Sequence, residues 1–168
     1  MSEAGVISYI WKPARNFRKG RRRPIASLIL HSTEGHKSGD IPTLIGGDGR
    51  QVSVHWYVTK TGEVWHFVQD VDTAFHAGAV VSPKYSNDAS LGIEQEHIDG
   101  KEPWPDVQLQ TVANLVAFLL QKHGELEIVS HAKAAPGRKH DPEPYEWKKF
   151  HSYLEEAEKV MWSAVQIK

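Results

Sequence analysis

The sequence SLILHST, residues 27–33, places a histidine directly after a short apolar run. The run starts near Ile25 and ends around His31, and its length and composition predict a buried β-strand. A second segment, LEIVSH at residues 126–131, has the same form and ends on His131. Strand ends are where a rigid sheet presents side chains to a cleft, so both histidines are candidates for one functional site.

The rest of the chain alternates between strand and helix patterns. VSVHWYVTKTGEVWHFV, residues 52–68, has two β-branched and aromatic runs around KTGE and predicts a β-hairpin. SLGIEQEH, residues 90–97, predicts another strand, whereas residues 38–51 predict a loop with one helical turn. Residues 105–123 and 145–165 carry apolar side chains at helical spacing. Together these patterns predict an α/β fold with a mixed sheet.

Composition limits the class of protein. The 168 residues show no break in composition, so we expect one globular domain, and we expect it to be a monomer. The longest apolar run, LVAFLL, lies inside an amphipathic pattern, so no transmembrane segment is expected. The N-terminus has no basic-then-apolar region, so no secretory signal peptide is expected either. Because the chain has no cysteine, any metal site must use histidine and carboxylate ligands.

Charge is concentrated at the N-terminus. Residues 1–23 contain seven basic residues and Glu3, a balance of +6, so the remainder carries −7. We therefore divide the chain into a basic arm, residues 1–24, and a globular domain, residues 25–168. The arm is expected either to bind anionic polymers of a cell envelope or to be a solvated segment. Nucleic acid is not expected as a partner, because aromatic residues are not interleaved with the basic ones.

A third metal ligand is available after His131. The turn AAPGRK reverses the chain and brings Asp141 ten residues beyond that histidine. Two neutral imidazoles and one carboxylate suit Zn²⁺, and three protein ligands leave one position for water, as in catalytic zinc sites. By spacing alone His140 is an equally reachable ligand, and only geometry separates it from Asp141.

Five motifs in order add a family resemblance: LILHST, VSVHWYVTKTGEVWHFV, AFHAG, NDASLGIEQE and VSHAKAAPGRKHDP. From about Ile25 to Trp147 the chain resembles the zinc-dependent N-acetylmuramoyl-L-alanine amidases. That family includes phage lysozyme-type amidases, bacterial muropeptide amidases and peptidoglycan recognition proteins. The resemblance implies a single α/β domain whose mixed sheet is flanked by helices, with zinc at the floor of a surface groove.

The resemblance also implies roles for individual residues. It places zinc on His31, His131 and Asp141, and a catalytic lysine on Lys139, which can donate to a developing oxyanion. Cleaving the amide between the lactyl group of N-acetylmuramic acid and L-alanine also requires a proton acceptor. Glu94 is the candidate, as a strand carboxylate facing the metal. Glu96 lies on the same face two residues on and is its competitor.

Three further residues are candidates for binding peptidoglycan. His76 in AFHAG matches a groove-lining motif, and its alternative is a packed loop histidine. Asn87 is expected either to hydrogen-bond substrate or to cap a turn. Trp56 is expected to stack on the glycan or to lie in the core.

The biological role has three alternatives. Val54 stands where the phage lysozyme-type and recognition-protein branches carry a tyrosine, which favours the glutamate-using muropeptide amidases. The basic arm favours a phage endolysin, held in the host cytoplasm until its release to the cell wall. The alternatives are a cytoplasmic muropeptide-recycling amidase and a non-enzymatic peptidoglycan-binding protein. An enzyme is favoured, because no predicted zinc ligand is missing.

Overall fold

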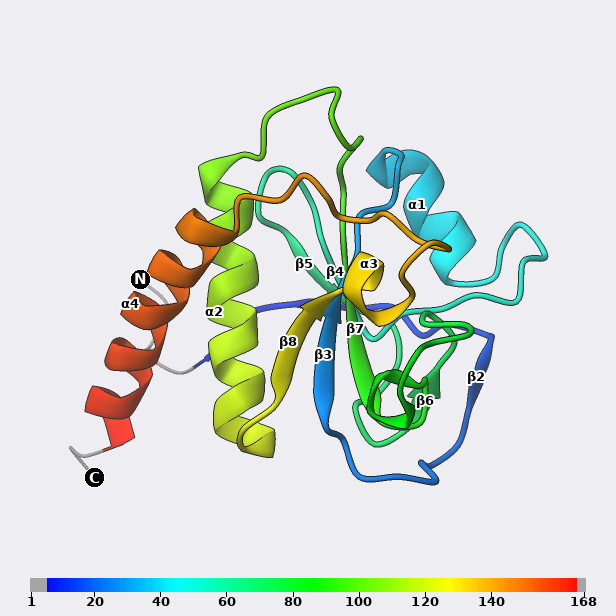
Figure 1. The fold of residues 1–168 in the computed structure, drawn as a ribbon, viewed down its shortest axis with the longest axis horizontal. Helices are drawn as coiled ribbons and strands as arrows, with labels where there is room; N and C mark the ends of the chain where they lie inside the picture. The colour runs from blue at the N-terminus through cyan, green and yellow to red at the C-terminus, as the bar shows by residue number, and fades with distance from the viewer. Residues whose placement is uncertain (1–5, 166–168) are drawn as a thin grey trace.

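The computed structural model describes residues 6–165, which form a central sheet with helices on both faces (Figure 1). Its elements in chain order are β1 (Ile10–Trp11), β2 (Phe17–Arg18), β3 (Ser27–Leu30), α1 (Lys37–Leu44), β4 (Trp56–Val58), β5 (Val64–His66), β6 (Thr73–Ala74), the 3₁₀ turn η1 (Pro83–Tyr85), β7 (Ser90–Gln95), α2 (Asp106–His123), β8 (Glu127–Ser130), α3 (His131–Ala134) and α4 (Trp147–Val165).

The central sheet is mixed. Its strand order is β1-β5-β4-β7-β3-β8, and β2 and β6 form a separate antiparallel pair. Strand β3 lies between β7 and β8 and runs parallel to both, whereas β4 and β5 form the predicted antiparallel hairpin. All four residues of β3 are buried, as expected for a strand covered on both faces. The predicted α/β class with a mixed sheet is confirmed.

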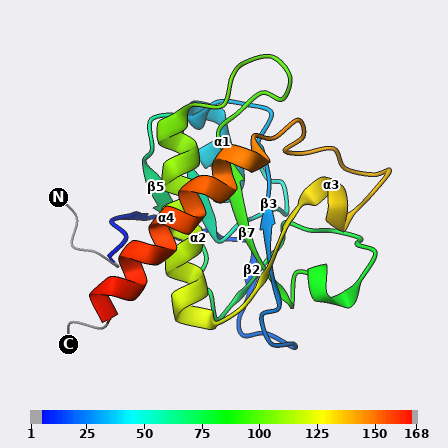
Figure 2. The same ribbon diagram turned by 60° about the vertical axis from the view of Figure 1, so that its left-hand side comes forward.

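Helices α2 and α4 pack against each other over one face of the sheet, as Figure 1 and Figure 2 show from two sides. The predicted apolar stripe of α2 is buried against Leu28 and Leu30 of β3. A fully buried leucine such as Leu115 stabilises the fold by roughly 2 kcal/mol.

Helix α2 ends at Gly124, whose φ of 85° suits glycine. The buried stripe of α4 is Phe150, Leu154, Ala157 and Met161.

The opposite face of the sheet is covered less evenly. Helix α1 packs there through Ile41 and Leu44 onto Val54, Tyr57 and Phe67. The prediction of one helical turn within residues 38–51 understated α1, which has eight residues and contains Pro42. A carboxylate distant in sequence supports its start, because Glu96 Oε1 accepts a hydrogen bond from the backbone N–H of Lys37 at 2.9 Å.

The proposed boundary at residue 24 is wrong for the described part of the basic segment. Strand β1 pairs with β5 in the central sheet, and β2 pairs with β6. Arg18 forms an ion pair with Asp88, and Arg21 donates to the carbonyl of Asp70 at 2.6 Å. The partners of these arginines lie about fifty to seventy residues away in sequence. The two side chains therefore connect distant segments of the folded domain. Residues 1–5 lie outside the described part of the chain.

Within residues 6–165, none of the helices has the length and apolar character needed to cross a bilayer.

Acid sensitivity follows from His66, a buried residue of β5. Its ring stacks on Trp56 with centroids 3.7 Å apart, and burial lowers its pKa to about 4. The pKa of an unfolded histidine is about 6.5, so as pH falls only the unfolded chain gains this proton, and stability is lost. At pH 5 the loss from this group is about 2 kcal/mol.

We expect His66→Phe to keep the aromatic stack and remove this titration. Between pH 7 and pH 5, its free energy of unfolding should fall by about 2 kcal/mol less than that of the wild type. Urea denaturation at both pH values measures this difference. Equal losses in the two proteins would show that His66 does not contribute to acid sensitivity.

Candidate metal centre and active site

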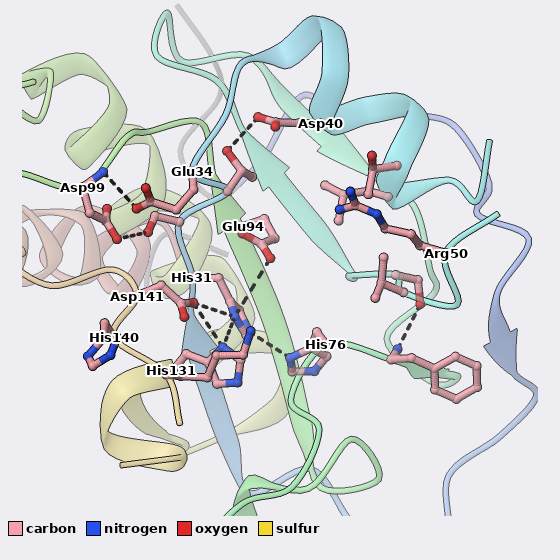
Figure 3. A pocket seen from close by; sticks show the side chains of 18 of the residues that line it. His31, Glu34, Asp40, Arg50, His76, Glu94, Asp99, His131, His140 and Asp141 are labelled. Carbon is pink, nitrogen blue, oxygen red and sulfur yellow. Dashed lines mark hydrogen bonds and ion pairs between the residues drawn. The ribbon is translucent and has the colours of Figure 1, made fainter. Parts of the chain in front are cut away.

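Two histidines meet at one edge of the sheet because their strands are neighbours. Leu30 of β3 pairs in register with Ser130 of β8, so the next residues, His31 and His131, leave the sheet side by side. Both side chains are buried. Their Nδ1 atoms are 3.0 Å apart (Figure 3). The sequence predicted this pairing, since both histidines directly follow apolar strands.

The third converging side chain is Asp141. The backbone N–H of Ala132 donates to the Asp141 carbonyl at 2.9 Å, which brings the loop after α3 back to His131. Asp141 Oδ2 lies 3.1 Å from His131 Nδ1 and 3.2 Å from His31 Nδ1. Among the described residues, these three form the cluster suited to a metal ion, and the exposed His140 is not a member. The geometry therefore favours Asp141 over His140.

The opposite nitrogen of each ring is held by the protein. His131 Nε2 lies 2.9 Å from the carbonyl oxygen of Ala77, to which it donates, and His31 Nε2 lies 2.9 Å from His76 Nδ1. The Ala77 carbonyl can only accept, so it places a ring proton of His131 on Nε2 and leaves Nδ1 of that ring available to a metal ion. The Nδ1 atoms of both histidines face Asp141. Partners of this kind orient the histidines of metal sites.

The donor set fits zinc. Tetrahedral zinc with bonds of about 2.0–2.1 Å separates its ligand atoms by about 3.3 Å, close to the separations of these three donors. Burial lowers the pKa of His31 to about 4, so this ring is neutral at pH 7. Burial raises the pKa of Asp141, but its close contacts with His131 and His31 outweigh this effect and hold that pKa below its ordinary value. Neutral imidazoles and an ionised carboxylate are the forms that bind metal.

Glu94 lies next to this cluster, as predicted. It is on β7, beside β3, and its Oε1 is 4.0 Å from His31 Nδ1. Burial raises the pKa of Glu94 well above its ordinary value, and the negative charges of Asp141 and Asp40 raise it further. A carboxyl group with a raised pKa can both accept and return a proton near neutral pH.

Both carboxylate oxygens of Glu96, the competing residue, accept hydrogen bonds from the backbone. Its Oε1 accepts from the backbone N–H of Lys37 and its Oε2 from that of Lys60, each at 2.9 Å. Its two oxygens therefore tie α1 to the hairpin. This arrangement supports Glu94 as the reactive carboxylate.

The cluster lies on the floor of a groove of about 550 Å³. Helix α1 forms one wall and the loop after α3 forms the other (Figure 3). Lys139 on that loop also lines the groove. Glu34 and Asp99 line one part of it and Arg50 another. The groove thus brings together the predicted ligands, Glu94 and Lys139, and it is open to a substrate.

Of the three predicted substrate-binding residues, only His76 lines the groove. Trp56 is in the core, where its Nε1–H donates to Asp70 Oδ1 at 2.9 Å, so of its two expected environments the core is correct and the glycan contact is not. Asn87 Oδ1 accepts from the backbone N–H groups of His76 and Ala77, so it holds that loop rather than the substrate. His76 does line the groove, but its ring supports His31.

Sequence reasoning missed two contributors to the site. The Ala77 carbonyl orients His131, and Arg138 donates to the same carbonyl at 2.6 Å. Asp40 of α1 is a buried carboxylate in the groove wall. The motif AFHAG contains Ala77, but the sequence could not identify its carbonyl as an acceptor, because every residue has a backbone carbonyl.

The sequence matches the N-acetylmuramoyl-L-alanine amidase family over residues 21–144. This chain belongs to that family. It is 32% identical over 108 residues to the 1,6-anhydro-N-acetylmuramyl-L-alanine amidase AmpD of Enterobacter cloacae, covering 61% of this chain and 57% of AmpD. It is 30% identical over 139 residues to the N-acetylmuramoyl-L-alanine amidase AmiD of Escherichia coli, covering 71% of this chain and 49% of AmiD. The matches span about half the length of these relatives.

Solved structures agree with this assignment of the amidase fold. A selenomethionine derivative of AmpD aligns with a TM-score of 0.73 and 22% identity, covering 92% of this chain and 99% of that one. E. coli AmiD, in complex with the substrate anhydro-N-acetylmuramic acid-L-Ala-D-gamma-Glu-L-Lys, aligns with a TM-score of 0.69 and 26% identity, covering 81% of this chain and 60% of AmiD. A Clostridium intestinale endolysin amidase shares the fold at 18% identity, with a TM-score of 0.63, covering 89% and 93%.

The assignment of ligands predicts different effects at two neighbouring histidines. His131→Ala removes a converging donor, so zinc stoichiometry should fall well below one per chain. His140→Ala removes an exposed side chain outside the cluster and should keep wild-type zinc content. Elemental analysis of purified protein measures both, and loss of zinc from the His140 variant alone would contradict the assignment.

Proposed function

We propose that this protein is a zinc-dependent amidase that hydrolyses the amide between the lactyl group of N-acetylmuramic acid and L-alanine. The observation that carries the proposal is the convergence of His31, His131 and Asp141 beside Glu94 on the groove floor. Membership of the amidase family supports the reaction class. The names of the AmpD and AmiD relatives support a muramyl peptide as the substrate.

The chain supplies the groups that the reaction needs. Zinc bound by His31, His131 and Asp141 would polarise the carbonyl and would make water more acidic. Glu94 takes the proton of the water that attacks the lactyl carbonyl carbon. As the carbon–nitrogen bond breaks, Glu94 delivers this proton to the leaving nitrogen of L-alanine, which leaves as an amine. Lys139 lines the same groove and stabilises the oxyanion that forms on the carbonyl oxygen.

The groove favours this reaction over a purely binding role. A protein that only binds peptidoglycan needs neither the open metal position nor a buried carboxyl group beside it. Glu94 Oε2 is buried and, among the described residues, has no hydrogen-bond partner. Leaving a buried polar atom unpaired costs free energy, and such groups are concentrated at reactive sites.

The biological role is proposed to be muropeptide recycling rather than lysis. The AmpD relatives are named for 1,6-anhydro-N-acetylmuramyl-L-alanine, which supports soluble muropeptides as the substrates. The endolysin role expected from the basic arm has weaker support, because Arg18 and Arg21 are committed to the fold. Binding of anionic envelope polymers, through exposed residues such as Arg22 and Arg23, stays a prediction, as does the monomeric state.

The role of Glu94 can be tested by removing its ionisable group while keeping its shape. Glu94→Gln should lower kcat by roughly 10² to 10⁴, because the variant cannot carry the proton. Its zinc content and muropeptide binding should stay near wild type. Release of the L-alanine amine from a soluble muropeptide gives the rate. The matched control is Glu96→Gln. A larger loss of rate in this control would show that Glu96, and not Glu94, transfers the proton.

The recycling role predicts a preference between two forms of the same substrate. The wild-type protein should release peptide from soluble 1,6-anhydro-muropeptides faster than from intact sacculi at equal concentrations of muramyl peptide. Both rates should disappear with a chelator and return with zinc. Faster release from sacculi would instead support the lytic alternative.

A further inference from the structure

Asp40 is a buried carboxylate outside the metal cluster. It belongs to α1, is 8% exposed and lines the groove. Its helix neighbours Ile41 and Leu44 belong to an apolar cluster. Burying a carboxylate costs free energy unless hydrogen bonds compensate for the lost hydration, so the partners of Asp40 are informative. Figure 3 shows Asp40 on the wall of the groove near Glu94.

Asp40 accepts two side-chain hydrogen bonds, one from the segment after His31 and one from strand β4. Thr33 Oγ1 donates to Asp40 Oδ2 at 2.7 Å, and Thr33 is two residues after His31. Tyr57 OH donates to the same oxygen at 2.9 Å. The carboxylate therefore links the segment that follows a metal ligand to the central strand β4.

Tyr57 connects this link to Glu94. Strands β4 and β7 are parallel, and Tyr57 is the register partner of Glu94. Register partners project from the same face of a sheet, so the tyrosine ring stands beside the glutamate side chain. Tyr57 is fully buried, and its hydroxyl is committed to Asp40. Asp40 thus fixes the side chain that borders Glu94.

The approach of the chain to Asp40 is close. A Cβ atom at Gly35 would lie 2.5 Å from Asp40 Oδ1, which is shorter than any tolerable contact. The turn that follows Thr33 is therefore packed directly against this carboxylate. Removing the carboxylate would therefore take packing as well as a hydrogen bond away from this turn.

We propose that Asp40 is a positioning residue of the active site, which holds the turn after His31 through Thr33 and the environment of Glu94 through Tyr57. This inference rests on the proposed amidase function. Because both partners are held before a substrate arrives, the effect is on the placement of reacting groups more than on substrate binding.

The test compares Asp40→Ala with Asp40→Asn, which keeps an acceptor oxygen for both hydroxyls. For zinc-saturated protein below its unfolding temperature, Asp40→Ala should lower kcat on a soluble muropeptide at least about tenfold, with little change in KM. Its dissociation constant for zinc, measured by competition with a chromogenic chelator, should rise at least about tenfold. Asp40→Asn should restore most of both quantities.

Ile41→Ala is the matched control. It truncates a buried apolar side chain next to Asp40 on α1 but leaves the hydrogen bonds from Thr33 and Tyr57 to Asp40 in place. It should lower Tm while keeping wild-type kcat and zinc affinity. If Asp40→Ala behaves in the same way, Asp40 is only a stabilising residue and the proposal is overturned.

Two milder variants keep the test decisive if Asp40→Ala does not fold. Thr33→Val and Tyr57→Phe each remove one hydroxyl and leave the carboxylate in place. A weaker zinc affinity in the first and a lower kcat in the second support the proposal, and wild-type values in both overturn it. A wild-type protein that binds zinc but cleaves no muropeptide would contradict the amidase function, while the zinc affinities would still test Asp40.

Discussion

The parallel register of β3 with its two neighbours determines where the functional groups lie. Leu30 is opposite Ile93 on one side and Ser130 on the other, so the next residues along the three strands are His31, Glu94 and His131. Backbone hydrogen bonds therefore set the separation of two of the proposed metal ligands and the proposed reactive carboxylate. A shift of one residue in either pairing would turn side chains to the opposite face and dismantle the site.

The remaining groups come from segments that the sheet does not control. Asp141 and Lys139 lie on the loop after α3, which is irregular because it must return to His131. The site places two imidazoles and one carboxylate together, with Glu94 beside them. The ionised carboxylate of Asp141 favours a bound cation and the ammonium group of Lys139, which lines the same groove.

Local sequence patterns predicted what depends on local structure. Helical spacing identified α2 and α4, and apolar runs located the strand ends at His31 and His131. The failures involve contacts between distant residues. A tryptophan on a strand gives no sign of whether it contacts a ligand or the core, so the sequence left both environments open for Trp56, which lies in the core. The charge of the N-terminal segment was clear, but the partners of Arg18 and Arg21 are about fifty to seventy residues away. Likewise, the contact of His76 with His31 spans 45 residues.

The central claim is that zinc is held by two imidazoles and one carboxylate, with a position left open for the reaction. X-ray absorption spectroscopy at the zinc edge of the metal-loaded protein tests this most directly, because multiple scattering from imidazole rings counts histidine ligands. The structure predicts two histidine nitrogens, one carboxylate oxygen from the protein and an exchangeable light-atom ligand. A spectrum that requires three imidazoles would contradict this account, since it would place His76 or His140 on the metal and close the open position.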